Sequence, residues 1–250
     1  MNKEIHKKNQ NLFIILGAFF IGNALIAELL GVKIFSAGQI FDIKPFKLFG
    51  NINFDYNMSV GTIIWPFVFI ISDLINEYFG RKGVKQISFI TAFLIAYAYI
   101  IIIIGTSLPP AQFWLDLNNI DNNGNNLNID HAYSVIFRQS SGIIIGSITA
   151  FLISQLIDAY IFYYVRKTTG HKALWLRATG STVISQIFDS FIVLFVAFYF
   201  LGNWNIKQVA EVAIIQYIYK VALAIALTPL IYIIHFIIDL YFKKQQVITK

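Results

Sequence analysis

Two copies of one polar pattern, Ser-Gln-x-x-Asp, interrupt long apolar stretches of the chain. The first copy holds Gln155 and Asp158, and the second holds Gln186 and Asp189. Residues three positions apart lie on one face of a helix, about one turn from each other. A carboxylate beside a carboxamide offers hydrogen-bond acceptors and donors in one plane, which suits a flat heterocyclic ligand. We predict that both pairs contribute to a ligand site; the alternative is that they bond across a helical hairpin for packing alone.

A third polar stripe carries Asp73, Asn76 and Glu77. Their spacing follows the i, i+3, i+4 rule, so the three side chains share one face of a helix. We predict that Asp73 contacts a ligand. Glu77 stands near the end of its apolar stretch, where two interpretations stay open: a ligand contact, or an ion pair with Arg81 four residues on.

Two basic residues, Lys220 and Arg177, lie within or at the edge of apolar stretches. A charge inside a membrane is costly, so such side chains face the bundle interior or extend to water. We expect Lys220 to contact a ligand or a carboxylate, or else to reach water. We expect Arg177 to neutralise Asp158 or Glu77. A carboxylate left unmatched at that depth either carries a proton or holds a cationic ligand or ion.

Aromatic, proline and glycine residues suggest how the helices bend and pack. Trp65 precedes Pro66, which bends a helix beside a ring that can stack on a planar ligand or simply pack. Thr228-Pro229 predicts a second kink, and Gly142 with Gly146 forms a G-x-x-x-G motif for close helix approach. The candidate substrate-binding residues are Trp65, Asp73, Asn76, Glu77, Gln155, Asp158, Arg177, Gln186, Asp189 and Lys220.

Several kinds of chemistry find no support in the residue types. The chain has no cysteine, which excludes thiolate zinc sites, iron–sulfur clusters and cysteine nucleophiles. The four histidines make no paired metal-ligand spacing, and no G-x-x-x-x-G-K-[ST] nucleotide motif occurs. The sequence shows no nucleophile that would pair with His235 as a base, which disfavours the alternative of an intramembrane enzyme. We therefore expect no metal, no cofactor and no catalytic residues.

The elements that position these residues must be membrane-spanning helices. Of the 250 residues, 57% are hydrophobic and 13% charged, and the mean hydropathy is +0.66. Each span takes about 20 residues. We predict an all-α fold, a polytopic membrane bundle of six transmembrane helices, as one domain over residues 11–242 between tails at 1–10 and 243–250. The expected spans lie near 11–30, 57–79, 86–108, 134–165, 173–201 and 211–242.

Lysine and arginine gather at alternate ends of these spans. Because cytoplasmic loops are enriched in both, both termini are expected in the cytoplasm. The net charge of +6 then reflects topology, so the expected partner is the lipid bilayer and not nucleic acid. Loop 31–56 is expected to cap the bundle or lie along the interface, and loop 109–130 to be mobile. The inner clusters are Lys3, Lys7, Lys8; Arg81, Lys82, Lys85; Arg166, Lys167, Lys172; and Lys243, Lys244, Lys250.

Three stretches of the sequence resemble the queuosine precursor transporter family. They are Ser72-Asp-Leu-Ile-Asn-Glu-Tyr-Phe-Gly-Arg-Lys, the run from Leu174 to Ser190 (LWLRATGSTVISQIFDS), and Tyr217-x-x-Lys220 followed by Thr228-Pro229. The resemblance covers spans two to six. It implies a six-helix importer of the bacterial inner membrane, similar in build to the substrate-binding subunits of energy-coupling-factor transporters. The implied substrates are 7-deazaguanines: 7-cyano-7-deazaguanine, 7-aminomethyl-7-deazaguanine or queuine.

This implied substrate agrees with the polar residues found above. A deazaguanine presents ring and amine donors beside a carbonyl acceptor, which a carboxylate and an amide complement. Asp189 with Gln186, or Asp158 with Gln155, is expected to bind that edge. The other motif is then expected to hold a gate on the opposite side of the substrate. Trp65 is expected to contact the ring.

Three other functions stay open from the sequence. The first is a substrate-binding subunit for another small heterocycle, which would need an ATP-driven partner chain. The second is the intramembrane enzyme, and the third is a channel, which the varied polar groups disfavour because a channel lining repeats. The driving force for import also stays open among protons, sodium, metabolic trapping and a partner ATPase.

Overall fold

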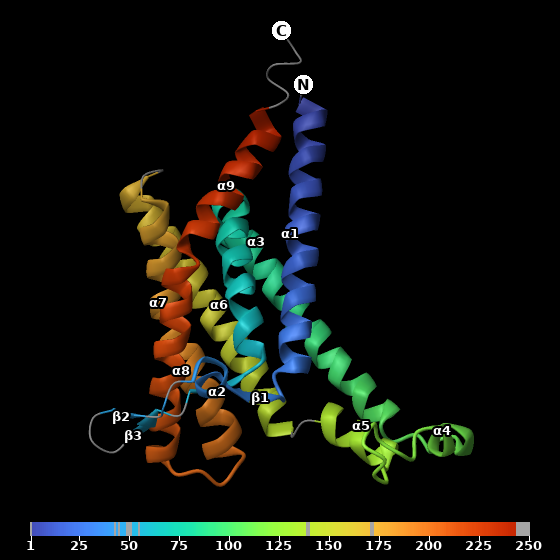
Figure 1. Cartoon of the computed structure of the whole chain (residues 1–250). Coiled ribbons are helices and arrows are strands. Elements are labelled where there is room, and N and C mark those ends of the chain that lie inside the picture. The colour runs from blue at the N-terminus through green and yellow to red at the C-terminus, as the bar shows by residue number, and fades with distance from the viewer. Residues whose placement is uncertain are drawn as a thin grey trace.

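Long helices dominate the computed structural model of the chain (Figure 1). Within the described residues, five helices are long and apolar enough to cross a membrane. Large apolar side chains cover their outer faces, whereas polar side chains such as Asp73, Gln155 and Gln186 lie buried between them. This pattern suits a lipid-exposed bundle and confirms the predicted class of polytopic helical membrane protein. The structure describes residues 2–42, 44, 46–48, 52–54, 56–138, 141–170 and 173–243.

The longest helix, α3 (Gly61–Gly105), is two helices joined at a sharp turn. Gly80 has φ 68° and ψ −175°, a conformation that side-chain-bearing residues essentially never adopt. The first half of α3 runs up to Gly80, and the second half descends beside α1 (Asn2–Leu30) (Figure 1). The halves correspond to the expected spans at 57–79 and 86–108. Helix begins only at Gly61, because residues 57–59 pair as a strand.

The helices α6 (Ser141–Thr169) and α7 (Leu174–Leu194) pack closely along their length. A π-helix, η1 (Phe195–Phe200), continues α7. At Gly146 an added Cβ would stand 2.9 Å from the carbonyl oxygen of Val193, and at Gly142 3.3 Å from that of Ala197. The G-x-x-x-G motif therefore does permit a close helix approach, as predicted.

The last predicted span, 211–242, is a broken helix. It consists of α8 (Ile206–Ala226) and α9 (Thr228–Lys243), separated at Leu227, so the predicted kink at Thr228-Pro229 is confirmed. Pro229 lies in the first turn of α9, where its missing N–H costs no intrahelical bond. The end of α9 meets the start of α1, since Lys8 Nζ donates to the Tyr241 carbonyl at 3.3 Å. Lys172, Lys244 and Lys250 of the predicted basic clusters, with the tail 244–250, lie outside the described residues.

Short strands stand at the other end of this otherwise helical bundle. β1 (Ile34–Ser36) pairs antiparallel with β4 (Asn57–Ser59), and β2 (Phe46–Leu48) pairs with β3 (Ile52–Phe54). A short helix, α2 (Ala37–Phe41), follows β1 and is capped by the Ser36 side chain. β4 leads directly into α3, and in both pairs the strands satisfy each other's backbone N–H and C=O groups.

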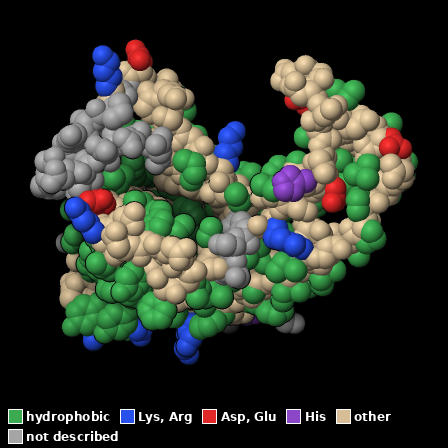
Figure 2. All heavy atoms as spheres, turned by 90° about the horizontal axis from the view of Figure 1, so that it is seen from below, with side chains coloured by type: hydrophobic (Ala, Val, Ile, Leu, Met, Phe, Trp, Pro, Cys, Tyr) green, Lys and Arg blue, Asp and Glu red, His purple; other side chains and the backbone are tan. Residues whose placement is uncertain are grey.

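A projecting segment stands away from the bundle at the same end (Figures 1 and 2). It contains α4 (Gln112–Leu117) and α5 (Ile129–Phe137), so the expected span at 134–165 is interrupted, and Arg138 has non-helical dihedral angles. Arg138 fastens the segment to α3 by donating to Ser107 Oγ at 2.6 Å and Thr106 Oγ1 at 3.2 Å. Within the segment, hydrogen bonds from the backbone and side chain of Asn125 hold the pKa of Asp121 below its usual value.

Candidate functional site

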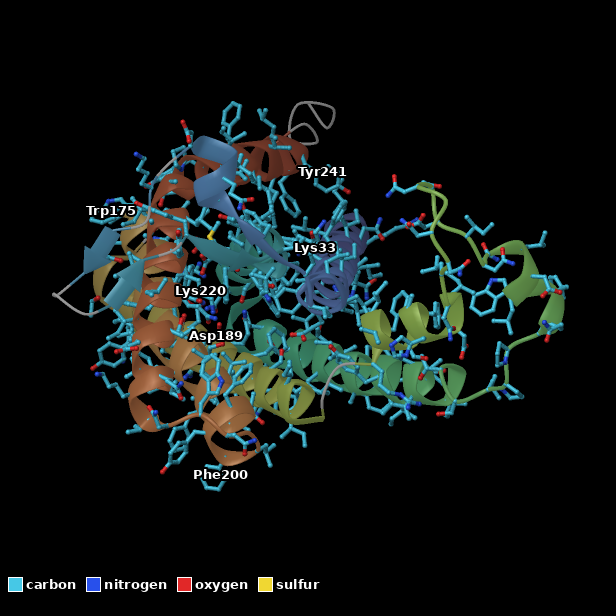
Figure 3. The ribbon with its side chains drawn as sticks, turned by 60° about the horizontal axis from the view of Figure 1, so that its bottom comes forward. Lys33, Trp175, Asp189, Phe200, Lys220 and Tyr241 are labelled. Carbon is cyan, nitrogen blue, oxygen red and sulfur yellow. The ribbon has the colours of Figure 1, made fainter. Side chains whose placement is uncertain are left out.

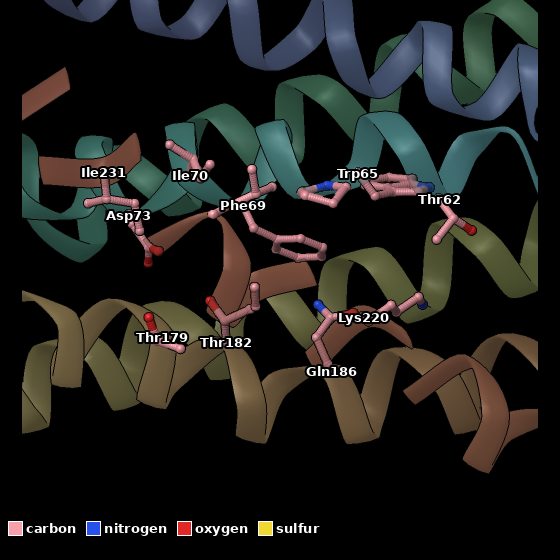
Figure 4. Close-up of a pocket in the computed structure, with 13 residues that line it drawn as sticks. Thr62, Trp65, Phe69, Ile70, Asp73, Thr179, Thr182, Gln186, Lys220 and Ile231 are labelled. Atoms are coloured by element: carbon pink, nitrogen blue, oxygen red, sulfur yellow. The ribbon is translucent and has the colours of Figure 1, made fainter. Parts of the chain in front are cut away.

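A narrow pocket lies inside the bundle, between the first half of α3, α7, α8 and the start of α9 (Figure 4). Its cavity volume is about 20 Å³, which is room for about one water molecule. The pocket is therefore too small for a heterocyclic ligand and must widen to take one. Its polar lining consists of Thr62, Asp73, Thr179, Thr182, Gln186 and Lys220, and its apolar lining includes Trp65, Pro66, Phe69, Ile70, Leu227 and Ile231.

Two polar side chains on opposite walls of the pocket lack hydrogen-bond partners. Among the described residues, Asp73 Oδ1 has none, and neither Oε1 nor Nε2 of Gln186 has one. Both side chains are almost fully buried, with 3% of Asp73 and 1% of Gln186 exposed. Leaving a buried polar group unpaired costs about 1–3 kcal/mol. A ligand that offers donors to Asp73 and both a donor and an acceptor to Gln186 would pair these atoms (Figure 4).

Aromatic rings form one wall of the same pocket. The rings of Trp65 and Phe69 lie 6.2 Å apart at an interplanar angle of 34°, and Trp65 also lies 5.7 Å from the ring of Phe151. Pro66 does not break the helix here, because Gly80 is the residue of α3 with non-helical angles. The wall offers flat apolar surface next to the unpaired polar groups, which suits a planar ring.

Lys220 reaches the pocket from α8 and forms an ion pair with Asp189 of α7 (Figure 3). Its Nζ donates to Asp189 Oδ2, while Ser154 Oγ donates to Asp189 Oδ1 at 3.3 Å. The side chains are 13% and 19% exposed, so the pair is largely removed from solvent. Of the outcomes expected for Lys220, the carboxylate contact is the one found.

The two Ser-Gln-x-x-Asp motifs face each other across the α6–α7 interface. The serine of each copy donates to the aspartate of the other: Ser154 to Asp189, and Ser185 Oγ to Asp158 Oδ1 at 3.1 Å. The motifs thus meet at one depth, as predicted, and bond across the hairpin. They differ in what their glutamines contact, because Gln155 Oε1 accepts from Ser72 Oγ at 2.7 Å.

A charged cluster closes the end of the bundle near Gly80. Arg177 binds Glu77 through two bonds of 2.9 Å, so the predicted neutralising role of Arg177 is confirmed, with Glu77 as the partner. Arg166 donates to the Glu77 carbonyl at 2.5 Å. Arg81, the alternative partner of Glu77, instead lies 4.1 Å over the ring of Tyr163.

The structure thus divides the candidate residues between the pocket and its surroundings. Trp65, Asp73, Gln186 and Lys220 line the pocket. The other six candidates lie outside its lining, where their hydrogen bonds hold α3, α6 and α7 together. Asn76, for example, donates to the Ala159 carbonyl at 3.2 Å. The remaining five are Glu77, Gln155, Asp158, Arg177 and Asp189.

Sequence reasoning missed Phe69, Thr179 and Thr182 of the lining. A periodic signal for two of them was present. Phe69 stands four residues after Trp65 and four before Asp73, and Thr182 stands four before Gln186, so each shares a helix face with a predicted residue.

Residues 59–234 match the family model described as "Putative vitamin uptake transporter". The chain is similar to a Bacillus subtilis protein named "Probable queuosine precursor transporter", with 28% identity over 76% of this chain and 75% of the relative. A Haemophilus influenzae protein of the same name is 24% identical over 78% and 79% of the two chains. The Escherichia coli "Queuosine precursor transporter" is 24% identical over 68% and 69%. No solved structure matches the chain.

Proposed function

The chain belongs to the vitamin uptake transporter family, and from this premise we propose that it imports queuosine precursors across the bacterial inner membrane. Its family consists of transporters and not enzymes. The named relatives support queuosine precursors as the substrate class. Within that class we propose the 7-deazaguanines: 7-cyano-7-deazaguanine, 7-aminomethyl-7-deazaguanine or queuine.

We propose six spans with both termini in the cytoplasm, in the manner of energy-coupling-factor substrate-binding subunits. The spans are α1, the two halves of α3, α6, α7 with η1, and α8 with α9. The start of α1, Gly80, the end of α6 and the end of α9 lie at one end of the bundle, which supports this arrangement (Figure 1). The described members of the basic clusters fall at that end, as expected for a cytoplasmic face.

Substrate recognition is assigned to Asp73 and Gln186, and the unpaired state of both side chains is the observation that supports it. The Asp73 carboxylate accepts from the ring N–H and exocyclic amine of a deazaguanine, and Gln186 donates to its carbonyl. Trp65 and Phe69 contact the ring face. The sequence offered Asp189 with Gln186, or Asp158 with Gln155, for this role. Asp73 takes the place of Asp189 here because Asp189 is already bound to Lys220 and Ser154, and the pair of Asp158 and Gln155 is bonded to Ser185 and Ser72.

Uptake of labelled 7-cyano-7-deazaguanine tests this proposal, in cells that cannot synthesise it. Asp73→Asn keeps the shape but replaces one acceptor oxygen with a donor, so uptake is expected to fall to the level of cells without the gene. Asp116→Asn makes the same change at an exposed residue that accepts from Gln112 outside the bundle, and uptake is expected to be unchanged.

Two results would contradict the proposal. The first is uptake at the original rate by the Asp73→Asn variant, with equal amounts of protein in the membrane. The second is an absence of any gene-dependent uptake. Transport by the purified chain alone in lipid vesicles would also separate this proposal from the alternative of a binding subunit that requires an ATP-driven partner.

A further inference from the structure

The acidic side chains between α3, α6 and α7 are unequally matched by cations. Glu77 is bound by Arg177, and Asp189 is bound by Lys220. Asp73 and Asp158 are 3% and 1% exposed, and across the described ranges no lysine, arginine or histidine forms an ion pair with either. The two lie at the same level of the α3–α6 interface, because Ser72 beside Asp73 donates to Gln155, and Asn76 one turn on donates to the carbonyl of Ala159, next to Asp158.

Oxygen atoms surround this unmatched pair. Ser185 Oγ donates to Asp158 Oδ1 at 3.1 Å, and the hydroxyls of Ser181 and Thr182 also face the Asp158 carboxylate. Thr182 lines the pocket into which Asp73 points, and Asp73 Oδ1 is without a partner there (Figure 4). Carboxylates and hydroxyls are ligands for a hard monovalent cation, and two neighbouring carboxylates can also share one proton.

We propose that Asp73 and Asp158 together bind one monovalent cation, a proton or Na⁺, which is carried inward with the substrate. Two unmatched carboxylates in the membrane interior repel each other and are poorly solvated, and one positive charge relieves both costs. Because one cation neutralises only one of the two negative charges, Asp73 still accepts from the N–H groups of the substrate. The inference rests on the proposed import function, and it makes cation and substrate binding mutually favourable.

The other charged groups near the pair already have partners. From α3 and α7, Glu77 and Arg177 form their bidentate pair; from α8, Lys220 faces Asp189 of α7. From α9, His235 Nδ1 lies 3.2 Å from Asp239, which also accepts from Tyr78 of α3. From α1, Glu28 accepts from Ser147 of α6. His235→Gln removes the one histidine of this set, so it serves as a control for proton effects that arise away from the two aspartates.

The test uses the purified full chain in lipid vesicles with labelled 7-cyano-7-deazaguanine. Initial uptake is measured with no gradient, with the outside made acidic, and with Na⁺ outside only. Exchange of external label for internal unlabelled substrate is measured in parallel. One of the two gradients is expected to raise uptake about fivefold or more, and the gradient that does so identifies the ion. Asp158→Asn is expected to lose this response while exchange stays detectable. Asp116→Asn and His235→Gln are expected to keep it.

Two outcomes of the vesicle test would overturn the inference: exchange by the unaltered protein with no response to either gradient, or a full response in Asp158→Asn. If the unaltered protein shows no exchange, the proposed function itself fails. Should Asp158→Asn be inactive in exchange, substrate binding to the unaltered protein in detergent decides the question. Affinity that rises with proton or Na⁺ concentration supports the inference, and affinity independent of both overturns it.

Discussion

Gln155 and Gln186 occupy the same place in the repeated motif, yet the structure gives them different tasks. Gln155 accepts a hydrogen bond from Ser72 and holds α6 against α3, whereas Gln186 points into the pocket with both polar atoms unpaired. The difference arises from what faces each helix, because α7 borders the pocket and the face of α6 that carries Gln155 borders α3. The two residues therefore form a matched pair for separating recognition from packing.

We predict that Gln186→Leu lowers substrate affinity about 10- to 100-fold, since the substrate's polar edge would lose its partner inside the bundle. Thermal stability in detergent should change little, because Gln186 has no protein partner to lose. Gln155→Leu is expected to do the reverse: it leaves Ser72 unpaired and lowers stability with little change in affinity. Equilibrium binding of labelled 7-cyano-7-deazaguanine and thermal unfolding measure the two effects. Equal loss of affinity in both variants would contradict the assignment.

Residue spacing predicted which side chains face inward but not how they pair. Asp73 is identifiable because a charged side chain inside a membrane helix costs free energy and is rare. Trp65 is identifiable because its large ring stands beside a proline. The partners depend on tertiary contacts: Arg177 had two acidic residues within plausible reach, and the structure selects Glu77. Likewise Lys220 reaches Asp189 because α8 packs against α7, which no local pattern encodes.

At the scale of helices, the turn at Gly80 is what brings the first half of α3 to the pocket and the second half beside α1. Its φ of 68° with ψ of −175° belongs to a region used almost only by glycine. An added Cβ at Gly80 would meet nothing within 4 Å, so the constraint lies in the backbone and not in space.

Gly80→Ala is accordingly expected to destabilise the protein by about 1–3 kcal/mol, through backbone strain alone. Gly22→Ala in α1 is the matched control, because a Cβ there also meets nothing within 4 Å and the backbone is helical. That change should be neutral or stabilising by up to about 1 kcal/mol. Thermal unfolding in detergent compares the two variants, and equal stability of both would show that the turn tolerates a side chain.

Hydropathy located the long helices well, since membrane-crossing segments must be apolar over their whole length. It misplaced the start of the second span and missed the short paired strands within residues 34–59. The pairing of Ile34 with Ser59 joins residues far apart in sequence, and three-residue strands leave no alternating pattern to detect. The projecting segment was missed for a related reason: α5 is apolar enough to be taken for the start of the span that α6 forms.

For the whole molecule, the central fact is that the pocket is shut. At the end near Gly80, contacts join α9 to its neighbours: Tyr78 donates to Asp239, and Lys8 donates to the Tyr241 carbonyl. Beside the pocket, the hydroxyls of Thr179 on α7 and Thr228 at the start of α9 are 2.8 Å apart. Since α8 and α9 are separated at Leu227, rotation of α9 about that break is the simplest way to open the end near Gly80.

This motion predicts that a covalent link between α7 and α9 stops transport. The chain has no cysteine, so Thr179→Cys with Thr228→Cys introduces a single pair, placed where the two hydroxyls already touch. Oxidation is expected to abolish uptake into vesicles, and reduction to restore it. The variant with Thr228→Cys alone should be insensitive to oxidation. Because Thr179 lines the pocket, substrate binding by the reduced double variant must be measured first. Undiminished uptake by the fully cross-linked protein would show that α9 stays fixed on α7 and that the pocket opens elsewhere.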